Sequence, residues 1–259
     1  MAIRDEVKEQ QNKLQGKTFK EKLAYFWDYY KIHTFVVLLI ILIVGIFIKD
    51  AITAKDSAFS ATLLNAYGTD TQEDFQKDFA AYAGIDLNIY DCFIDLASTL
   101  SYETMSQMDL AVSQRILAMA QTGEIDVMVS DEAPFANYSK ALMFKDLREE
   151  LSAEEYTKFE PYFYYIDKAL LDVDDEENES IYDENGNPVL VDALVDHRNP
   201  DVMEDPMPVG IYLDDNIRLK EWNCYNYENA SPIFGFVYSS ERPELCHQFL
   251  SYLTKEESN

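Results

Sequence analysis

The chain has 259 residues, 47% of them hydrophobic and 14% aromatic, which is typical of an ordered domain and not of a disordered chain. Its formal net charge is −27, and the charge is uneven: residues 1–31 carry a net of +2 and residues 32–259 a net of −29. A surface this acidic repels phosphate backbones, so we expect no nucleic-acid partner. Cations and basic peptides suit it better than anionic ligands do.

A long apolar segment near the N-terminus is the first distinct feature of the chain. Residues 35–48 carry no charge, and with residues 32–34 they make an apolar run of 17 residues, at the short end for a membrane span. Trp and Tyr clustered at one end of such a run are typical of a membrane interface. The interface residues are Tyr25, Trp27, Tyr29 and Tyr30, followed by Lys31. We therefore expect a transmembrane helix over residues 32–49.

The lysines around this segment indicate its orientation. Four precede it closely, at positions 17, 20, 22 and 31, and two follow it, at positions 49 and 55. This bias predicts a cytoplasmic basic and aromatic helix over residues 1–31, a linker over residues 50–57 and an extracellular domain over residues 58–259. The alternative is a signal peptide cleaved near Ala54 or Ser60, but the 31 residues before the apolar run are much longer than an ordinary n-region.

After residue 57, short apolar runs alternate with helical patterns. Strands are predicted over Ala58–Ala66, Leu87–Ile94 and Ile125–Val129. Between them, one helix follows Thr71 and ends at Gly84, and a longer helix runs from Ser101 to Gly123. Strand–helix–strand units of this length imply right-handed crossovers. The expected fold class is therefore α/β, a mostly parallel sheet with flanking helices.

The later part of the chain predicts helices, a hairpin and further strands. Several short helices fit residues 130–167, one of them capped by Ser152 with Glu155 completing a capping box. Strands are predicted over residues 207–213 and 232–240, and a last helix over Pro243–Thr254.

An Asn-Gly pair at positions 185–186, between apolar stretches, predicts a hairpin over residues 180–195. Alternate Asp and Asn residues from 183 to 187 also suggest a calcium loop. That alternative is poorer, because Pro188 stands where an EF-hand has Gly and Leu194 where it has Glu.

The motifs of several enzyme classes are missing from the sequence. The eight glycines lie at least 16 residues apart, so neither a G-x-G fingerprint nor a Walker A loop exists. The three histidines are scattered, and no zinc spacing or G-x-S-x-G elbow occurs. We therefore expect no metal and no cofactor. A hydrolase that uses two of the many carboxylates is the least favoured function.

The three cysteines, Cys92, Cys224 and Cys246, form no CxxC motif and exclude a disulfide framework. We expect all three to be small buried hydrophobes. At most one bridge can form among them, and Cys224 and Cys246 are the pair nearest in sequence. Cys246 and His247 are adjacent on a predicted helix, where neighbouring side chains diverge by about 100°. They cannot form a nucleophile–base pair unaided.

Two stretches carry a family resemblance. In GEIDVMVSDEAPFANYSKALMFKDLREEL, residues 123–151, a helix ends at Gly, a strand follows, and an acidic or small residue leads into the next helix. Near the C-terminus, PIFGFVYSSERPELCHQFLSYLTKEE combines a strand, a small polar pair and a closing helix. The chain thus resembles the extracellular solute-binding proteins of ABC transporters, with the type 2 periplasmic-binding-protein fold, over residues 58–151 and 232–256. It is also similar to short bacterial membrane proteins with a WDYYKxHT helix.

By position, this resemblance implies a ligand cleft at the carboxyl ends of the strands. The implied lining residues follow the first, third and last strands: Tyr67, Gly68, Thr69, Ser130, Asp131, Glu132, Tyr238, Ser239 and Ser240. The resemblance further implies a main lobe over residues 58–153 and 232–256, and a reduced second lobe over residues 154–231 that contains the hairpin. Members of the family are usually lipid-anchored or free, whereas we expect a helix to hold this chain.

The leading functional hypothesis is a bacterial single-pass membrane protein that presents a solute-binding-like domain outside the cell for ligand binding or sensing, without catalysis. Its partners would be the lipid bilayer, through residues 32–49, and a small-molecule ligand. The alternative is a non-enzymatic membrane interaction protein whose degenerate domain docks on a protein or cell-wall partner.

Overall fold

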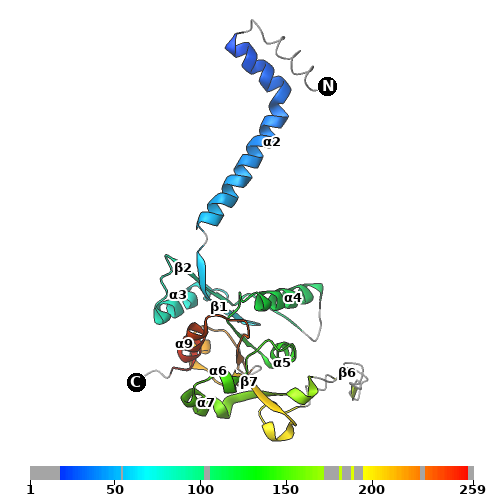
Figure 1. Cartoon of the computed structure of the whole chain (residues 1–259), viewed down its shortest axis with the longest axis vertical. Coiled ribbons are helices and arrows are strands. Elements are labelled where there is room, and N and C mark those ends of the chain that lie inside the picture. Colours follow the sequence, from blue (N-terminus) through cyan, green and yellow to red (C-terminus); the bar gives the residue numbers. More distant parts are fainter. Residues whose placement is uncertain are drawn as a thin grey trace. The chain divides into compact units, whose positions relative to one another are not determined.

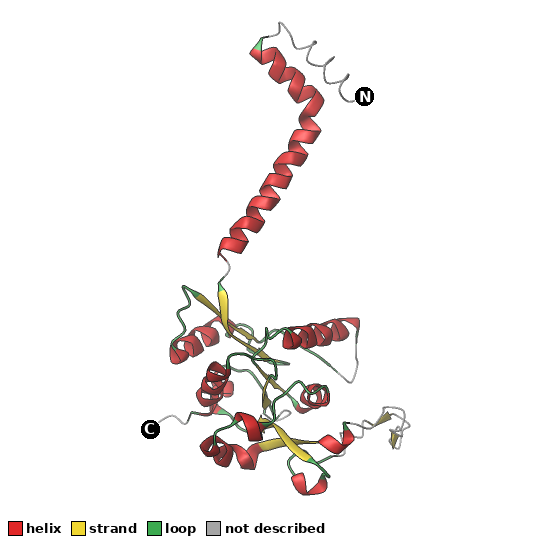
Figure 2. Ribbon diagram, in the orientation of Figure 1, coloured by secondary structure: helices red, strands yellow, loops and turns green. Residues whose placement is uncertain are grey.

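The computed structural model of the protein describes residues 18–53, 55–101, 106–171, 181–182, 188–189, 195–227 and 231–255. The chain forms two compact units, residues 1–55 and residues 56–259 (Figure 1). The first unit contains one long helix, and the second contains the strands and the shorter helices (Figure 2).

Helix α2, Phe19–Thr53, is continuous over 35 residues. One stretch of it, Lys31–Lys49, is long and apolar enough to cross a membrane. The large apolar side chains from Phe35 to Ile48 are exposed, and leaving so many in water would be unfavourable. All five predicted interface residues lie on this helix, and the Trp27 ring contacts that of Phe35 with centroids 6.4 Å apart.

The second unit contains a six-stranded sheet in the order β2-β1-β3-β8-β7-β4. Its strands are β1 Asp56–Leu63, β2 Tyr90–Asp95, β3 Val127–Ser130, β4 Phe163–Asp167, β7 Pro206–Tyr212 and β8 Ile233–Phe236. Strand β1 pairs in parallel with β2 and β3, whereas the β3–β8, β8–β7 and β7–β4 pairs are antiparallel. The α/β class is confirmed, but the sheet is mixed: the expectation of a mostly parallel sheet holds only for β1, β2 and β3.

Helices cover both faces of this sheet. Helix α3, Gln72–Ala83, connects β1 to β2 on one face, and helix α4, Gln107–Gln121, connects β2 to β3 on the other. Helix α5, Glu132–Lys140, packs on the same face as α4, and helix α9, Pro243–Thr254, packs with α3 (Figure 1). The two crossovers, β1 to β2 and β2 to β3, move in opposite directions along the sheet, and right-handed connections of this kind place their helices on opposite faces.

The central strands are buried on both faces. Along β3, Val127 and Val129 face the core beneath α3 and α9, whereas Met128 faces the core beneath α4 and α5. None of the three has exposed surface. Burial on two sides explains why this stretch of sequence is continuously apolar and not alternating.

Two glycines allow α5 to approach the sheet closely. A Cβ added to Gly210 would lie 2.6 Å from the Phe135 ring of α5, and one added to Gly235 would lie 2.6 Å from the Phe144 ring. These two rings are stacked, with centroids 4.3 Å apart. The packing fixes the position of α5, whose N-terminus carries Asp131.

The remaining described elements are short. They are α6 Leu147–Glu150, α7 Ala153–Phe159, α8 Ile217–Glu221, the 3-10 helices η1 Glu160–Tyr162, η2 Lys168–Leu170 and η4 Pro200–Val202, and the strands β5 Ile181–Tyr182 and β6 Pro188–Val189. Ser152 and Glu155 form the predicted capping box of α7. Strands β5 and β6 pair in the antiparallel sense that the predicted hairpin needs, and the alternative calcium residues at 183–187 lie outside the described residues.

The secondary structure of β4 and the N-cap residue of α4 differ from the predictions made from the sequence. The segment Phe163–Asp167 was expected among short helices, but its aromatic residues favour a strand, which pairs with β7. Both strands fall in the range expected to form a second lobe, yet they extend the main sheet of one compact unit. Helix α4 is capped by Ser106, not Ser101, because the Ser106 hydroxyl and the Asp109 carboxylate form a capping box.

The three cysteines are buried and free, so Cys224 and Cys246 form no bridge. Burial raises the pKa of each thiol to about 12, which leaves almost no thiolate at neutral pH. The interpretation as small buried hydrophobes is confirmed.

Candidate functional site

The carboxyl ends of β1 and β3 meet at one edge of the sheet. The chain passes from β1 to β2 on one side and returns to β3 on the other side of β1, so the strand order reverses between β1 and β3. In open α/β sheets, ligands bind in the crevice at such a switch point. A cleft of about 470 Å³ lies there, a size within the range of small-molecule sites.

The cleft is formed by the loops that follow the three parallel strands and by the first residues of α4 and α5. The residues that determine its chemistry are Asn65, Tyr67, Leu100, Ser101, Asp109 and Asp131. Tyr67 and Asp131 are among the site residues predicted from the sequence, and the structure brings them together.

Asn65 ties the walls of the cleft together. It follows β1 in the left-handed region, with φ 61°, which Asn adopts more readily than most residues. Its Oδ1 accepts from the Leu100 N–H at 2.7 Å, and its Nδ2 donates to the Leu100 carbonyl and to Asp131 Oδ1, each at 3.0 Å. The sequence analysis missed Asn65, although a polar residue closing the apolar run in LLNAYG was an available signal.

Asp131 precedes α5 as its N-cap residue, but its carboxylate makes no capping hydrogen bond. The carboxylate instead accepts the Asn65 amide. Burial raises the pKa of Asp131 above its ordinary value, although the Asn65 hydrogen bond opposes this effect. No described residue forms an ion pair with Asp131, so a partly buried carboxylate without a cation lines the cleft.

Asp109 contributes a second carboxylate to the cleft. It accepts hydrogen bonds from the Ser106 hydroxyl at 2.5 Å, the Ser106 N–H at 2.8 Å and the Ser101 N–H at 3.0 Å. These bonds, that from the Ser106 hydroxyl above all, lower the pKa of Asp109 to about 2. Asp109 is therefore ionised at neutral pH, and its hydrogen bonds close the N-terminus of α4.

Two backbone carbonyls beneath the cleft are hydrogen-bonded to a buried tyrosine. The hydroxyl of buried Tyr225 lies 2.9 Å from the Leu64 carbonyl and 3.1 Å from the Val129 carbonyl, and it can donate to either. These carbonyls lie at the carboxyl ends of β1 and β3. These two carbonyls are therefore already bonded within the protein and are not free to bind a ligand.

Four other predicted site residues lie beside the cleft but do not line it. Gly68 is buried, and Thr69 is exposed. The buried Ser130 hydroxyl donates to the Asp131 carbonyl at 3.1 Å. Glu132 accepts a 3.5 Å hydrogen bond from the Tyr212 hydroxyl of β7.

The three predicted residues after β8 lie at the opposite edge of the sheet. Because β8 runs antiparallel to β3, its carboxyl end meets the beginning of β3. Tyr238 donates its N–H to the Met143 carbonyl, and the Ser239 hydroxyl bonds the Ala120 carbonyl at the end of α4. The prediction that Tyr238, Ser239 and Ser240 share a cleft with Asp131 is wrong, because it assumed a parallel strand.

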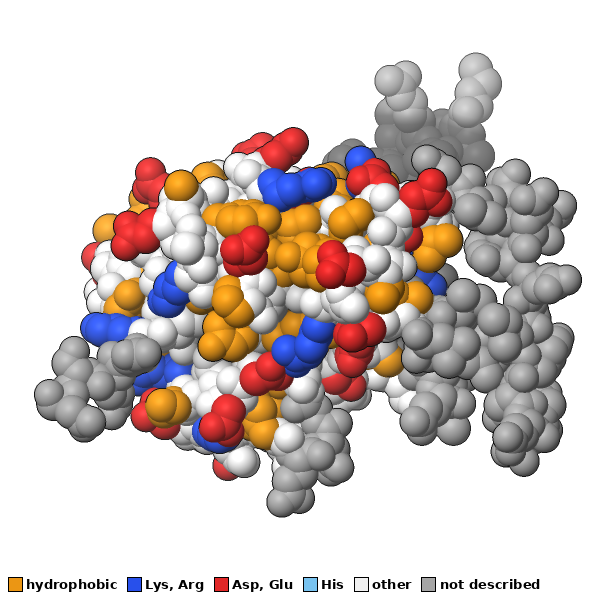
Figure 3. Space-filling view, turned by 90° about the horizontal axis from the view of Figure 1, so that it is seen from below, with side chains coloured by type: hydrophobic (Ala, Val, Ile, Leu, Met, Phe, Trp, Pro, Cys, Tyr) orange, Lys and Arg blue, Asp and Glu red, His pale blue; other side chains and the backbone are white. Residues whose placement is uncertain are grey.

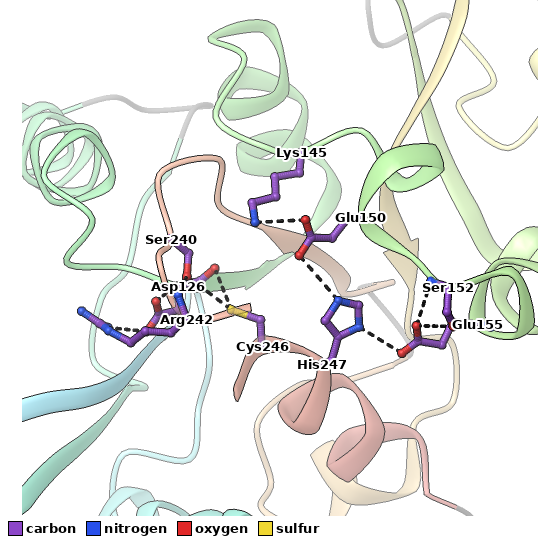
Figure 4. Close-up of polar contacts among 9 residues, drawn as sticks. All are labelled: Asp126, Lys145, Glu150, Ser152, Glu155, Ser240, Arg242, Cys246 and His247. Atoms are coloured by element: carbon purple, nitrogen blue, oxygen red, sulfur yellow. Dashed lines mark hydrogen bonds and ion pairs between the residues drawn. The ribbon is translucent and has the colours of Figure 1, made fainter. Parts of the chain in front are cut away.

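At that opposite edge, Asp126 is fully buried and fully paired (Figure 4). Its carboxylate accepts from the Ser60 N–H at 2.8 Å, the Ser240 hydroxyl at 2.6 Å and Arg242 Nη1 at 2.6 Å. This network joins β1 to the loops before β3 and after β8. We interpret it as structural, because all its charges are compensated within the protein.

His247 on α9 belongs to a separate network. Its Nδ1 lies 3.0 Å from Glu155 Oε1 and its Nε2 lies 3.5 Å from Glu150 Oε1, while Lys145 pairs with Glu150 at 3.0 Å. Figure 4 shows the Cys246 sulfur directed toward Ser240, away from the His247 ring. The two side chains diverge as predicted.

The part of the chain that the structure describes contains no group of three or more His, Cys, Asp or Glu side chains placed to hold a metal ion. The cleft between β1 and β3 therefore offers a different chemistry: two carboxylates, one amide and an exposed aromatic ring in a space that a small molecule can occupy.

The Asp126 network predicts a large cost for removing its cation. Arg242→Met leaves a buried, unpaired carboxylate and should lower the free energy of unfolding by about 3 kcal/mol. The matched control is Arg148→Met, which removes an exposed pair with Asp146 and should cost less than about 1 kcal/mol. Urea unfolding at pH 7 measures both, and equal losses would contradict the structural role of Asp126.

The Asp131 environment predicts a stabilising variant. Burial raises the pKa of Asp131 in the folded protein above its unfolded value, so the ionised carboxylate costs stability once the pH rises through the folded pKa. Asp131→Asn keeps the acceptor for Asn65 and removes this cost. Its melting temperature should exceed that of the wild type at pH 7, and the difference should shrink as the pH is lowered toward 4. A lower melting temperature at pH 7 would contradict this account.

The comparisons of the chain with family models, with curated proteins and with solved structures each found no match. The resemblance to solute-binding proteins therefore remains a prediction from the sequence.

Proposed function

We propose that this protein is a single-pass membrane protein that presents a ligand-binding or sensing domain, residues 56–259, outside the cell. The observation that carries the proposal is the cleft between the carboxyl ends of β1 and β3. It lies where α/β sheets bind ligands, and Asn65 holds its walls in a fixed arrangement before any ligand arrives.

The anchor is supported by the apolar stretch Lys31–Lys49 of α2. A cleaved signal sequence is the competing interpretation of this stretch. Cleavage near Ser60 would cut through β1, where the Ser60 N–H donates to Asp126. Cleavage near Ala54, which precedes β1, would leave the strand intact. Against that alternative, the long segment before the apolar run favours a retained helix. The lysine bias favours a cytoplasmic N-terminus.

Binding is favoured over catalysis by the roles of the cleft carboxylates. Their pKa values are displaced in opposite directions, a pattern that acid–base pairs of hydrolases also show. The low pKa of Asp109, however, is accounted for by its capping of α4. The capping role of Asp109 thus explains its low pKa, and ligand binding does not require a catalytic role for this carboxylate.

A second candidate function is docking on a protein or cell-wall partner. Figure 3 shows the lower face of the molecule, where hydrophobic side chains gather among acidic and basic ones. Exposed apolar side chains lie on three 3-10 helices: Tyr162 on η1, Leu170 on η2 and Val202 on η4. Such surfaces often mark interaction sites, but they also occur on ordinary monomers.

Thermal melting with a small-molecule panel tests the proposed function. Both hydrophobic cores lie within residues 56–259, so the melting assay can use this segment without α2. A ligand at a hundred times its dissociation constant adds about 2.7 kcal/mol of stability. We expect at least one amino acid, sugar, oligopeptide or polyamine to raise the melting temperature.

Two variants locate the effect. Ala133→Phe places a large ring in the cleft and should abolish the stabilisation, whereas Ala153→Phe, at the exposed N-terminus of α7, should leave it unchanged. A cooperative melt that no compound shifts would contradict the proposal and favour the docking function.

A further inference from the structure

The charge of the cleft has one sign. Asp109 and Asp131 line it, and no Lys or Arg does so among its described residues. The nearby Arg115 is already paired, because its Nη2 lies 2.6 Å from the Ser98 hydroxyl and 3.4 Å from Asp95 Oδ2. An anion in the cleft would face two carboxylates without a compensating cation, whereas a cation would be attracted.

The comparison of Asp131 with Asp126 shows what is missing in the cleft. Both carboxylates flank β3, one at each end. Asp126 accepts three hydrogen bonds, one from the guanidinium of Arg242. Asp131 accepts the neutral Asn65 amide and has no cationic partner among the described residues. A ligand ammonium group beside Asp131 would supply the charge that Arg242 supplies to Asp126.

The other walls of the cleft favour an apolar group next to that ammonium. The ring of Tyr67 lines the cleft, together with Leu100 and Pro134, which are themselves buried and expose little surface. Tyr67 is 67% exposed, so its ring is available to pack against a ligand. An aromatic face also attracts a cation within about 6 Å.

A metal ion fits these residues less well. Calcium takes six to eight oxygen ligands, usually from several carboxylates. The cleft provides two carboxylates, and one of them is engaged in three hydrogen bonds that close α4. An organic ammonium needs fewer ligands than this.

We propose that the cleft binds a small organic cation, in which an ammonium group pairs with Asp131 and an adjacent apolar part packs on the exposed ring of Tyr67. This inference rests on the proposed function, because it names the chemical class of ligand for the same cleft.

The test uses three compounds of similar shape and different charge. They are phenethylamine, a cation at pH 7, 2-phenylethanol, which is neutral, and 3-phenylpropionate, an anion. Binding is measured by titration calorimetry on the full-length protein in phosphatidylcholine nanodiscs, with empty nanodiscs as the blank. We expect phenethylamine to bind at least tenfold more tightly than the other two compounds.

Two charge-neutralising variants separate Asp131 from the overall negative charge. Asp131→Asn should weaken phenethylamine binding at least tenfold and leave the affinity for 2-phenylethanol within twofold. Glu124→Gln, at an exposed position near the opposite edge of the sheet, removes the same charge and should leave both affinities within twofold. Equal losses in the two variants would show that net charge, and not Asp131, attracts the amine.

The outcomes also separate this inference from the proposed function. If 2-phenylethanol or 3-phenylpropionate binds more tightly than the amine, and Ala133→Phe abolishes that binding, the cleft is a ligand site but the cationic class is wrong. If none of the three compounds binds the wild-type protein, the ammonium inference is wrong, and the thermal panel decides separately whether the cleft binds anything.

Discussion

The pairing of β3 with β1 on one side and β8 on the other determines what gathers at each end of the sheet. Because β1 and β3 are parallel, the loops after them meet at one edge and form the cleft. Because β8 is antiparallel to β3, the polar residues after β8 are carried to the other edge, where they surround Asp126. The core then holds this arrangement in place: glycines in β7 and β8 admit the Phe135 and Phe144 rings, and Phe135 positions α5 and the Asp131 that precedes it.

The two aspartates that flank β3 have different roles in the domain. Four residues of β3 separate them, which at about 3.3 Å per residue places them roughly 16 Å apart. Asp126 joins distant parts of the chain, and its charge is compensated internally by Arg242. Asp131 is held by a neutral amide and keeps an uncompensated charge at the cleft. Removing the cation from the first arrangement would leave a buried charge unpaired, which is costly. The second arrangement gives up some stability at a site available for binding.

Local sequence signals predicted much of the fold and only part of the site. The apolar run of α2, Gly84 after α3 and the capping box at Ser152 are recognisable within a few residues, and the structure contains all three. Strand direction has no such local signal, because an apolar strand has the same sequence pattern whether its neighbour is parallel or antiparallel. The sequence analysis therefore named Tyr67 and Asp131, which both line the cleft, but added Tyr238, Ser239 and Ser240, which lie at the opposite edge of the sheet. It also missed Asn65, whose importance lies in contacts 35 and 66 residues away along the chain.

The claim on which this account depends most is that ligands bind at the carboxyl ends of β1 and β3. An NMR titration of ¹⁵N-labelled residues 56–259 with phenethylamine tests the location directly, because each backbone amide reports its own surroundings. The account predicts chemical-shift changes centred on Asn65, Ser101 and Ala133, with none at Ser239 and Ser240. Changes centred on the Asp126 edge or on the β4 edge, or no changes at any amide, would contradict it.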